Sequence, residues 1–124
     1  MSLCVITAGK AVSIAAAAFT LSWTHSVEKT RWEEDWRITT AGLEIVEARI
    51  KGSGAGMEPP DGAVLEEGWL VYAPDVPPQR RVVLAASGAT GEGWSLCARD
   101  ECIEIGAAAG EPVTLTLCDG RSMK

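Results

Sequence analysis

The stretch Phe19-Thr20-Leu21-Ser22-Trp23-Thr24-His25-Ser26-Val27 decides the fold class. Apolar side chains and one histidine occupy every second position, and hydroxyl side chains fill the positions between them. Successive side chains of a β-strand point to opposite faces of its sheet, so a period of two predicts a strand with one buried face. The sequence therefore contains a half-buried strand near its N-terminus.

Short β-prone segments with Gly and Pro between them continue through the rest of the chain. The expected strands are 3–7, 11–14, 31–38, 43–51, 63–65, 69–72, 81–86, 94–97, 102–105 and 113–118. This pattern predicts one all-β antiparallel domain over residues 1–118, a sandwich or a small barrel built from hairpins, with a polar tail over 119–124.

Residues 30–38 allow two interpretations. Thr30-Arg31-Trp32-Glu33 reads as a helix capping box, with Trp32 and Trp36 at helical spacing. The alternation of Trp32, Glu34, Trp36 and Ile38 instead indicates a strand. We favour the strand, because a helix here would be barely two turns long.

The composition excludes several classes of protein. The chain has 124 residues, 11 Lys and Arg against 17 Asp and Glu, a net charge of −6 and a pI near 4.7. A nucleic-acid or anionic-membrane binder would need a basic surface. No apolar run reaches the roughly 18 residues of a membrane-spanning helix.

Four cysteines allow three complete pairings. The short loop between Cys97 and Cys102 would place these two opposite each other in a hairpin. Cys4 and Cys118 lie on the first and last expected strands, and their pairing would close the sheet on itself. Zinc is a weaker alternative, because two tight ligand pairs are missing.

The cysteines and the N-terminus indicate different compartments. Disulfides require an oxidising compartment, which favours a periplasmic or other extracytoplasmic location. The N-terminal residues form a poor signal peptide, with Lys10 as the only early positive charge, and this favours the cytoplasm. The location stays open on these grounds.

The densest polar cluster of the chain covers residues 25–37. The residues that we expect to form a ligand or partner surface are His25, Ser26, Glu28, Lys29, Trp32, Glu33, Glu34 and Trp36. His25 and Ser26 cannot form a nucleophile–base pair, since neighbouring side chains on a strand point to opposite faces. A metal site, a recognition surface and a purely structural role all stay open for this cluster. No cofactor is expected.

The partner of His25 can be predicted from a hairpin. If the chain turns at residues 28–31, Trp32 lies near Val27 and Glu34 lies near His25 on the same face. Such a pair would favour the protonated imidazole and make the site sensitive to pH. Glu28 is the second choice of partner.

A glycine-rich loop contains Gly52, Ser53, Gly54 and Gly56. A dinucleotide site would need a helix directly after these glycines, and Pro59-Pro60 prevents one. A phosphate nest of backbone N–H groups and a tight turn with positive φ both stay possible, and the turn is preferred.

Three segments resemble domain-of-unknown-function family 1850. They are Phe19 to Thr30, Glu33-Glu34-Asp35-Trp36, and Glu47-Ala48-Arg49-Ile50-Lys51-Gly52-Ser53-Gly54-Ala55-Gly56-Met57. The family consists of small bacterial proteins linked by gene neighbourhood to TAXI-type TRAP transporters, which import solutes with the help of an extracytoplasmic binding protein. The resemblance implies a non-catalytic accessory or binding module, with a TRAP membrane or solute-binding subunit as its partner.

An enzyme is the alternative from a different class. It would act on a small molecule and use His25 with Glu28, Glu33 or Glu34 as acid and base or as a metal site. A histidine in a cleft with convergent polar groups would favour a ligand site or an enzyme, and a sealed histidine would favour a scaffold.

Overall fold

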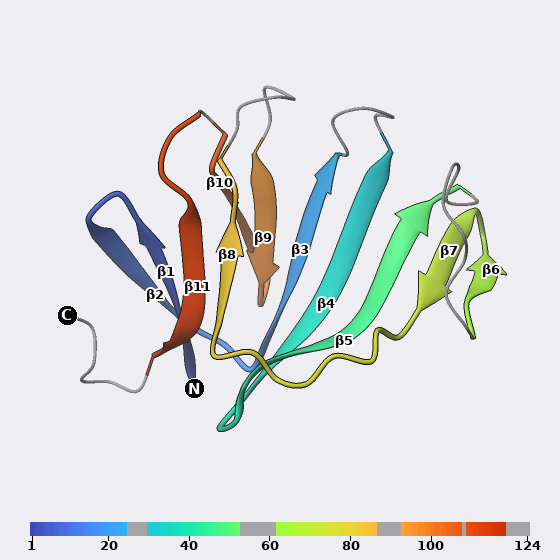
Figure 1. Cartoon of the computed structure of the whole chain (residues 1–124), viewed down its shortest axis with the longest axis horizontal. Coiled ribbons are helices and arrows are strands. Elements are labelled where there is room, and N and C mark those ends of the chain that lie inside the picture. The colour runs from blue at the N-terminus through green and yellow to red at the C-terminus, as the bar shows by residue number, and fades with distance from the viewer. Residues whose placement is uncertain (25–29, 53–61, 87–92, 108, 119–124) are drawn as a thin grey trace.

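The protein is described by a computed structural model that covers residues 1–24, 30–52, 62–86, 93–107 and 109–118 (Figure 1). These residues form eleven antiparallel strands in two sheets. The two sheets share one apolar core in a sandwich-like arrangement. The all-β antiparallel class is therefore confirmed. Of the two forms expected, the described strands adopt the sandwich and do not close into a barrel.

The larger sheet has seven strands in the order β10-β9-β3-β4-β5-β7-β6. Their bounds are Glu101–Ile105 (β10), Trp94–Ala98 (β9), Ala18–Thr24 (β3), Arg31–Thr39 (β4), Gly42–Lys51 (β5), Trp69–Tyr72 (β7) and Val64–Glu66 (β6). Figure 1 shows this sheet as a curved row in which β3 and β4 occupy the middle.

The smaller sheet has four strands in the order β2-β1-β11-β8. Their bounds are Lys10–Ala15 (β2), Ser2–Thr7 (β1), Val113–Cys118 (β11) and Arg81–Leu84 (β8). The first and last strands of the chain are thus neighbours, which brings the two ends of the described chain together (Figure 1). Leu3, Val113 and Leu115 from this sheet are almost completely buried against the larger one.

The alternation along β3 has the expected structural meaning. Phe19 and Leu21 are 3% and 1% exposed and belong to the core, whereas Thr20 and Ser22 make polar contacts on the opposite face. Burying two such side chains contributes roughly 1.5–3 kcal/mol each. The apolar parity of β3 therefore fixes which face of the large sheet meets the core.

Residues 31–38 lie within a strand, as favoured above, but the expected hairpin register is wrong. Trp32 lies opposite Trp23, and Glu34 lies opposite Leu21. Relative to the expected pairing of Trp32 with Val27, the register is shifted by four residues. The parity of the faces is unchanged by an even shift, so the correct residues still point inward.

A β-bulge interrupts the pairing of β4 with β5. Asp35 lies opposite Glu47, but the next residue, Trp36, lies opposite Ile45, which leaves Val46 as an extra residue. An extra residue reverses the side-chain parity of one strand relative to its neighbour. Because of the bulge, Ile45 packs against the core while Val46 is 43% exposed.

Both cysteine pairs that the sequence suggests are disulfides. Cys97 and Cys102 lie directly opposite each other in the β9–β10 hairpin, with their Cα atoms 4.0 Å apart. Cys4 of β1 is joined to Cys118 of β11, with a Cα–Cα distance of 5.3 Å. The expectation that this second pairing closes the sheet is wrong, because β2 and β8 remain as the two edges of the smaller sheet.

Candidate functional site

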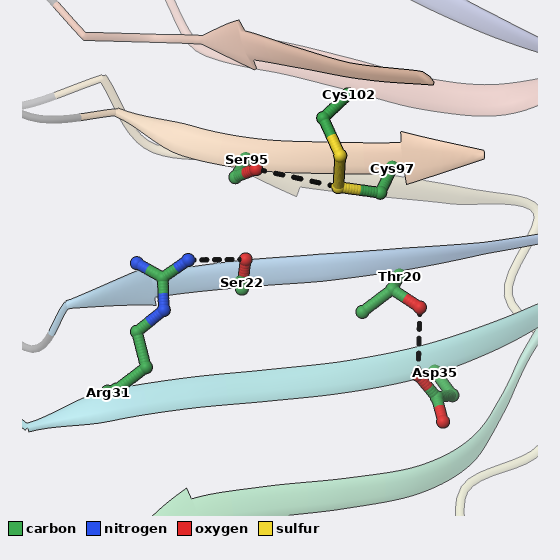
Figure 2. Close-up of a disulfide and its surroundings, with 7 residues drawn as sticks. All are labelled: Thr20, Ser22, Arg31, Asp35, Ser95, Cys97 and Cys102. Carbon is green, nitrogen blue, oxygen red and sulfur yellow. Dashed lines mark hydrogen bonds between the residues drawn. A yellow bond between two sulfur atoms is a disulfide. The ribbon is translucent and has the colours of Figure 1, made fainter. Parts of the chain in front are cut away.

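The outer face of the large sheet, which points away from the core, carries a line of small polar side chains along β3. Thr20 donates a hydrogen bond to Asp35 Oδ1 on β4 at 2.9 Å, and Arg31 of β4 donates to Ser22 Oγ at 2.8 Å (Figure 2). Both hydroxyl groups are therefore engaged by the neighbouring strand. Small side chains on β3 keep this strip of the surface low between the longer side chains of β4 and the β9–β10 disulfide.

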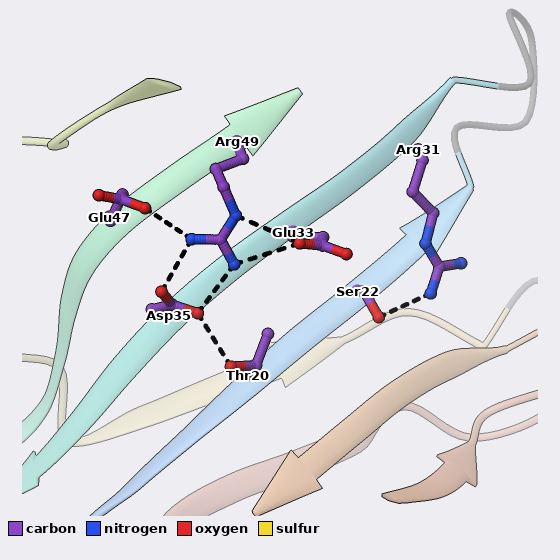
Figure 3. Close-up of polar contacts among 7 residues, drawn as sticks. All are labelled: Thr20, Ser22, Arg31, Glu33, Asp35, Glu47 and Arg49. Atoms are coloured by element: carbon purple, nitrogen blue, oxygen red, sulfur yellow. Dashed lines mark hydrogen bonds and ion pairs between the residues drawn. The ribbon is translucent and has the colours of Figure 1, made fainter. Parts of the chain in front are cut away.

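Arg49 of β5 organises the charged part of the same face (Figure 3). Its Nη1 donates to Asp35 Oδ2 at 2.8 Å and to Glu47 Oε2 at 2.6 Å, and its Nε donates to Glu33 Oε1 at 3.2 Å. A planar guanidinium with five N–H donors suits such a set of carboxylates. One cation is thus shared by three acids, so this cluster keeps an excess of negative charge.

The Arg49 contacts alter the acid–base properties of the cluster. Hydrogen bonds from Arg49 hold the pKa of the Asp35 carboxyl below its ordinary value, although burial acts in the opposite direction. Hydrogen bonds to Asp35 likewise raise the pKa of the Arg49 guanidinium. Both groups stay ionised at neutral pH, so the cluster is a fixed electrostatic feature and not a proton donor or acceptor.

A pocket of about 870 Å³ opens beside this cluster, on the outer face between β4 and the β9–β10 hairpin. Its volume lies in the range of about 300–1,000 Å³ that is typical of small-molecule sites. The pocket exists because Ala18 and Thr20 of β3 are small and do not fill the space between β4 and the β9–β10 hairpin. Val46, the extra residue of the bulge, also lines it. The other lining residues with side chains of interest are Asp35, Arg37, Cys97, Arg99, Asp100, Glu101 and Cys102.

Apart from the Cys97–Cys102 disulfide in its wall, the polar groups of this pocket serve binding. Thr20 and Asp35 already use their polar atoms on each other and on Arg49, and Arg37 pairs with Glu44. No nucleophile lies beside a general base among the described lining residues. The described residues also hold no group of three or more His, Cys, Asp or Glu side chains that could bind a metal ion.

A second polar group lies on the inner face of the large sheet. Trp36 Nε1 donates to Glu34 Oε1 at 3.0 Å. Burial raises the pKa of the Glu34 carboxyl, and the hydrogen bond from Trp36 opposes that shift in part. Burial also raises the pKa of Tyr72, with a smaller contribution from the charge of Glu34. Glu34 is therefore the described carboxyl most ready to carry a proton.

The residues expected to form one recognition surface are divided between the two faces of β4. Glu33 lies on the outer face with Arg49, whereas Trp32, Glu34 and Trp36 lie on the inner face. Trp36 is 7% exposed and stacks on Phe19 in the core, with ring centroids 6.0 Å apart. Alternation along the strand separates these neighbours, so they do not act as a single surface.

Several expected site residues lie outside the described part of the chain. These are His25, Ser26, Glu28 and Lys29, and Ser53, Gly54 and Gly56 of the glycine-rich loop. The described member of that loop, Gly52, has φ +87° and donates its N–H to Gly68 O at 2.6 Å. The positive φ expected for the glycines of this loop is thus observed at Gly52, and the choice between a turn and a phosphate nest rests on residues outside the described part of the chain.

Of the outer cluster, only Glu33 was among the site residues expected from the sequence; Asp35, Glu47 and Arg49 were not. Glu33 and Asp35 share one parity on β4, and Glu47 and Arg49 share one parity on β5. Acidic residues on one strand and an arginine on the next indicate a cross-strand ion pair. The sequence contains these residues, but it does not reveal the bulge that brings Glu33 and Asp35 to the same face as Glu47 and Arg49.

The comparisons with known proteins give one match. The family model described as "Domain of unknown function (DUF1850)" matches residues 19–105, which is more than two thirds of the chain. The match includes β3, β4, β5 and the β9–β10 hairpin, and so every strand that lines the pocket. No curated protein and no solved structure is significantly similar to this chain. Within the described residues, no helix is long and apolar enough to cross a membrane.

Proposed function

The chain belongs to the DUF1850 family, and from this premise we propose that it is a non-catalytic accessory or binding module of a TRAP-type solute transport system. Its partner in this proposal is the membrane subunit or the solute-binding subunit of the transporter. The module works in the periplasm or another extracytoplasmic compartment, where its two disulfides are stable.

The observation that carries this proposal is the pocket on the outer face. It is large enough for a ligand or for a side chain of a partner, and its walls are largely apolar with charges of both signs at the rim. Polar atoms on its floor already have partners within the sheet. The polar groups on this floor supply shape and orientation to what the pocket binds.

The surroundings of the pocket support docking against a larger partner. The cluster of Arg49 with its three carboxylates borders the pocket through Asp35, which belongs to both. Four hydrogen bonds from Arg49 to these carboxylates fix its geometry. A rigid, acidic patch beside an apolar hollow steers a partner with a complementary basic rim and an apolar projection. We therefore place the partner contact on the outer face of β3, β4 and β5.

The test is co-purification with the transporter subunits. Val46→Arg places a long charged side chain in the pocket wall at a position that is already 43% exposed, so we expect the variant to fold. Val83→Arg is the matched control, since Val83 is 57% exposed on β8 of the other sheet. We expect Val46→Arg to reduce recovery of the subunits at least tenfold and Val83→Arg to leave it unchanged. Equal recovery with both variants would contradict this docking surface, and no recovery with the wild-type protein would contradict the association itself.

One observation favours a second candidate function, a small-molecule enzyme. Glu34 is a partly buried carboxyl whose pKa is raised, as in many general acids. The sequence offers His25 and Glu28 as partners for Glu34, and both lie outside the described residues. Glu33 is unsuited to this role, because it lies on the opposite face with Arg49. Glu34→Gln distinguishes the candidates: it would abolish an enzymatic activity but leave subunit recovery on the outer face unchanged.

A further inference from the structure

We infer that the Cys97–Cys102 disulfide is a thiol–disulfide exchange site, at which a small zwitterionic peptide thiol enters the outer pocket and attacks Cys102 Sγ. Both cysteines line the pocket together with charged residues of the β9–β10 turn. This inference does not depend on association with a transporter.

The two sulfur atoms of this bond differ in their access to solvent. Cys102 is exposed on β10, the edge strand of the large sheet, whereas Cys97 is half-buried between β10 and β3. An attacking thiolate must approach a sulfur from outside the disulfide, so access selects Cys102. The other disulfide lacks this access on one side, because Cys4 is 0% exposed.

Ser95 makes Cys97 the better leaving group. Its Oγ lies 3.7 Å from Cys97 Sγ on the outer face of β9 (Figure 2). A disulfide sulfur has no proton, so the hydroxyl is the donor of this contact. The same hydroxyl would donate to the thiolate that forms on Cys97 when the bond breaks, and thiol–disulfide exchange is faster when the leaving thiolate is stabilised.

The hairpin keeps its form when the bond is open. Cys97 and Cys102 are separated by 5 positions, whereas Cys4 and Cys118 are separated by 114. A disulfide that closes a short loop removes less entropy from the unfolded chain, so the fold depends less on it. The β9–β10 pairing from Trp94↔Ile105 to Ala98↔Glu101 holds the two cysteines opposite each other after the bond has opened.

The exchange is balanced in atoms and electrons. The thiolate of the peptide forms a bond with Cys102 Sγ, and the Cys97–Cys102 bond breaks with its electron pair passing to Cys97, which becomes a thiolate. A second peptide thiolate then attacks the peptide sulfur of the mixed disulfide and releases the Cys102 thiolate. Two peptide thiols are thereby oxidised to one peptide disulfide, and the protein disulfide is reduced to two thiols.

The charges at the pocket rim suit a peptide that carries both signs. Arg99 lines the pocket and would bind the carboxylates of such a ligand, while Asp100 and Glu101 of the same rim would bind its ammonium group. Within the described structure, the Arg99 side chain makes one hydrogen bond, from Nη1 to Ala15 O at 3.4 Å, so its other N–H groups can bind a ligand. A thiol without charges would use none of these contacts.

The test uses reduced glutathione as the probe and the folded full-length protein. After exposure to glutathione for set times, free thiols are alkylated and each cysteine is assigned by mass spectrometry. We expect Cys97–Cys102 to open at least tenfold faster than Cys4–Cys118, with the first glutathione adduct on Cys102. Equal rates at the two bonds, or a first adduct on Cys97, would overturn the inference.

Two matched variants test the roles of the neighbouring residues. Ser95→Ala should slow opening by about 2- to 10-fold, the effect of losing one hydrogen bond, whereas Ser13→Ala, which removes the hydroxyl 3.7 Å from Cys118 Sγ, should not change it. Arg99→Asn keeps a residue that tolerates the observed φ of +57°. It should slow glutathione but not uncharged 2-mercaptoethanol. If Arg99→Asn slows both thiols equally, or neither, the pocket does not select a zwitterionic peptide, and the inference fails in that part.

Discussion

Replacing Arg49 with methionine should destabilise the protein by about 2–3 kcal/mol at pH 7. The variant keeps most of the stem and removes every N–H donor to Asp35, Glu33 and Glu47. A hydrogen bond to a charged group contributes roughly 1.5–3 kcal/mol, but these acids are 28–41% exposed and water replaces part of the loss. The expected loss of stability in Arg49→Met is therefore close to the contribution of one such hydrogen bond. Repulsion among the three carboxylates, which Arg49 no longer neutralises, adds to this loss.

The matched control for this variant is Arg37→Met. Arg37 is 59% exposed, and among the described residues its one ion pair is with Glu44. Exposed ion pairs contribute about 0.2–1 kcal/mol, so the control should lie near 0.5 kcal/mol. Urea unfolding followed by tryptophan fluorescence measures both values. Equal losses for the two variants would refute the idea that Arg49 organises the outer face.

The pH dependence of the free energy of unfolding provides a second, independent test. Arg49 lowers the pKa of Asp35 below its ordinary value of 3.8. The stability that this contact provides is complete above that value and is lost as the pH falls through the lower pKa of the folded protein. The difference between wild type and Arg49→Met should therefore be full at pH 7 and should shrink on acidification below about pH 3.8. A difference that stays constant down to pH 2 would show that packing of the Arg49 stem, and not its charge, is responsible.

Three further predictions concern other parts of the fold. Replacing Cys4 and Cys118 by serine should cost about 5 kcal/mol and replacing Cys97 and Cys102 about 2 kcal/mol in thermal unfolding, because the closed loops differ in length; a larger loss for the second pair would contradict this order. Glu34→Gln should become increasingly stable relative to wild type as the pH rises from 4 to 8, because ionisation of a carboxyl whose pKa is raised in the folded state destabilises the wild-type protein. Urea unfolding at the two pH values measures the difference in the free energy of unfolding. A difference that does not change with pH would contradict the burial of this carboxyl. Gly42→Ala should cost at least about 2 kcal/mol, because φ is +130° and a Cβ would lie 2.5 Å from Gln79 O; Gly9→Ala, with φ +87° and open space, is the control and should cost less in the same melting experiment.

The sequence was sufficient to predict most of the strands and the inward faces of β3 and β4. Alternation along β3 predicts which residues are buried, since Phe19 and Leu21 share one parity and both belong to the core. Glycines and prolines mark the turns, and the hairpin positions of Cys97 and Cys102 follow from loop length. These features are local, and their physical causes act within a few residues of the chain.

The register of β3 with β4 was not predictable in the same way. A two-residue shift of a hairpin keeps every apolar residue on its own face, so burial alone does not choose among the even registers. The observed choice places Trp32 opposite Trp23, with their rings stacked at a centroid distance of 6.0 Å. Aromatic cross-strand pairs stabilise a sheet, and this pair distinguishes the observed register from the one that we expected.

The outer site depends on Val46, the extra residue that interrupts the alternation of side chains along β5. In a regular β5, Ile45 and Glu47 would lie on the same face of the sheet. If that face pointed outward, Ile45 would be exposed to solvent, and if it pointed inward, Glu47 would be buried in the core. The bulge at Val46 resolves this conflict, since Ile45 faces inward on one side of it and Glu47 and Arg49 face outward on the other. The same residue that breaks the pattern also lines the pocket. On β5, the break in the alternation of apolar and polar residues therefore marks the functional surface, because the regular alternation accounts only for the core.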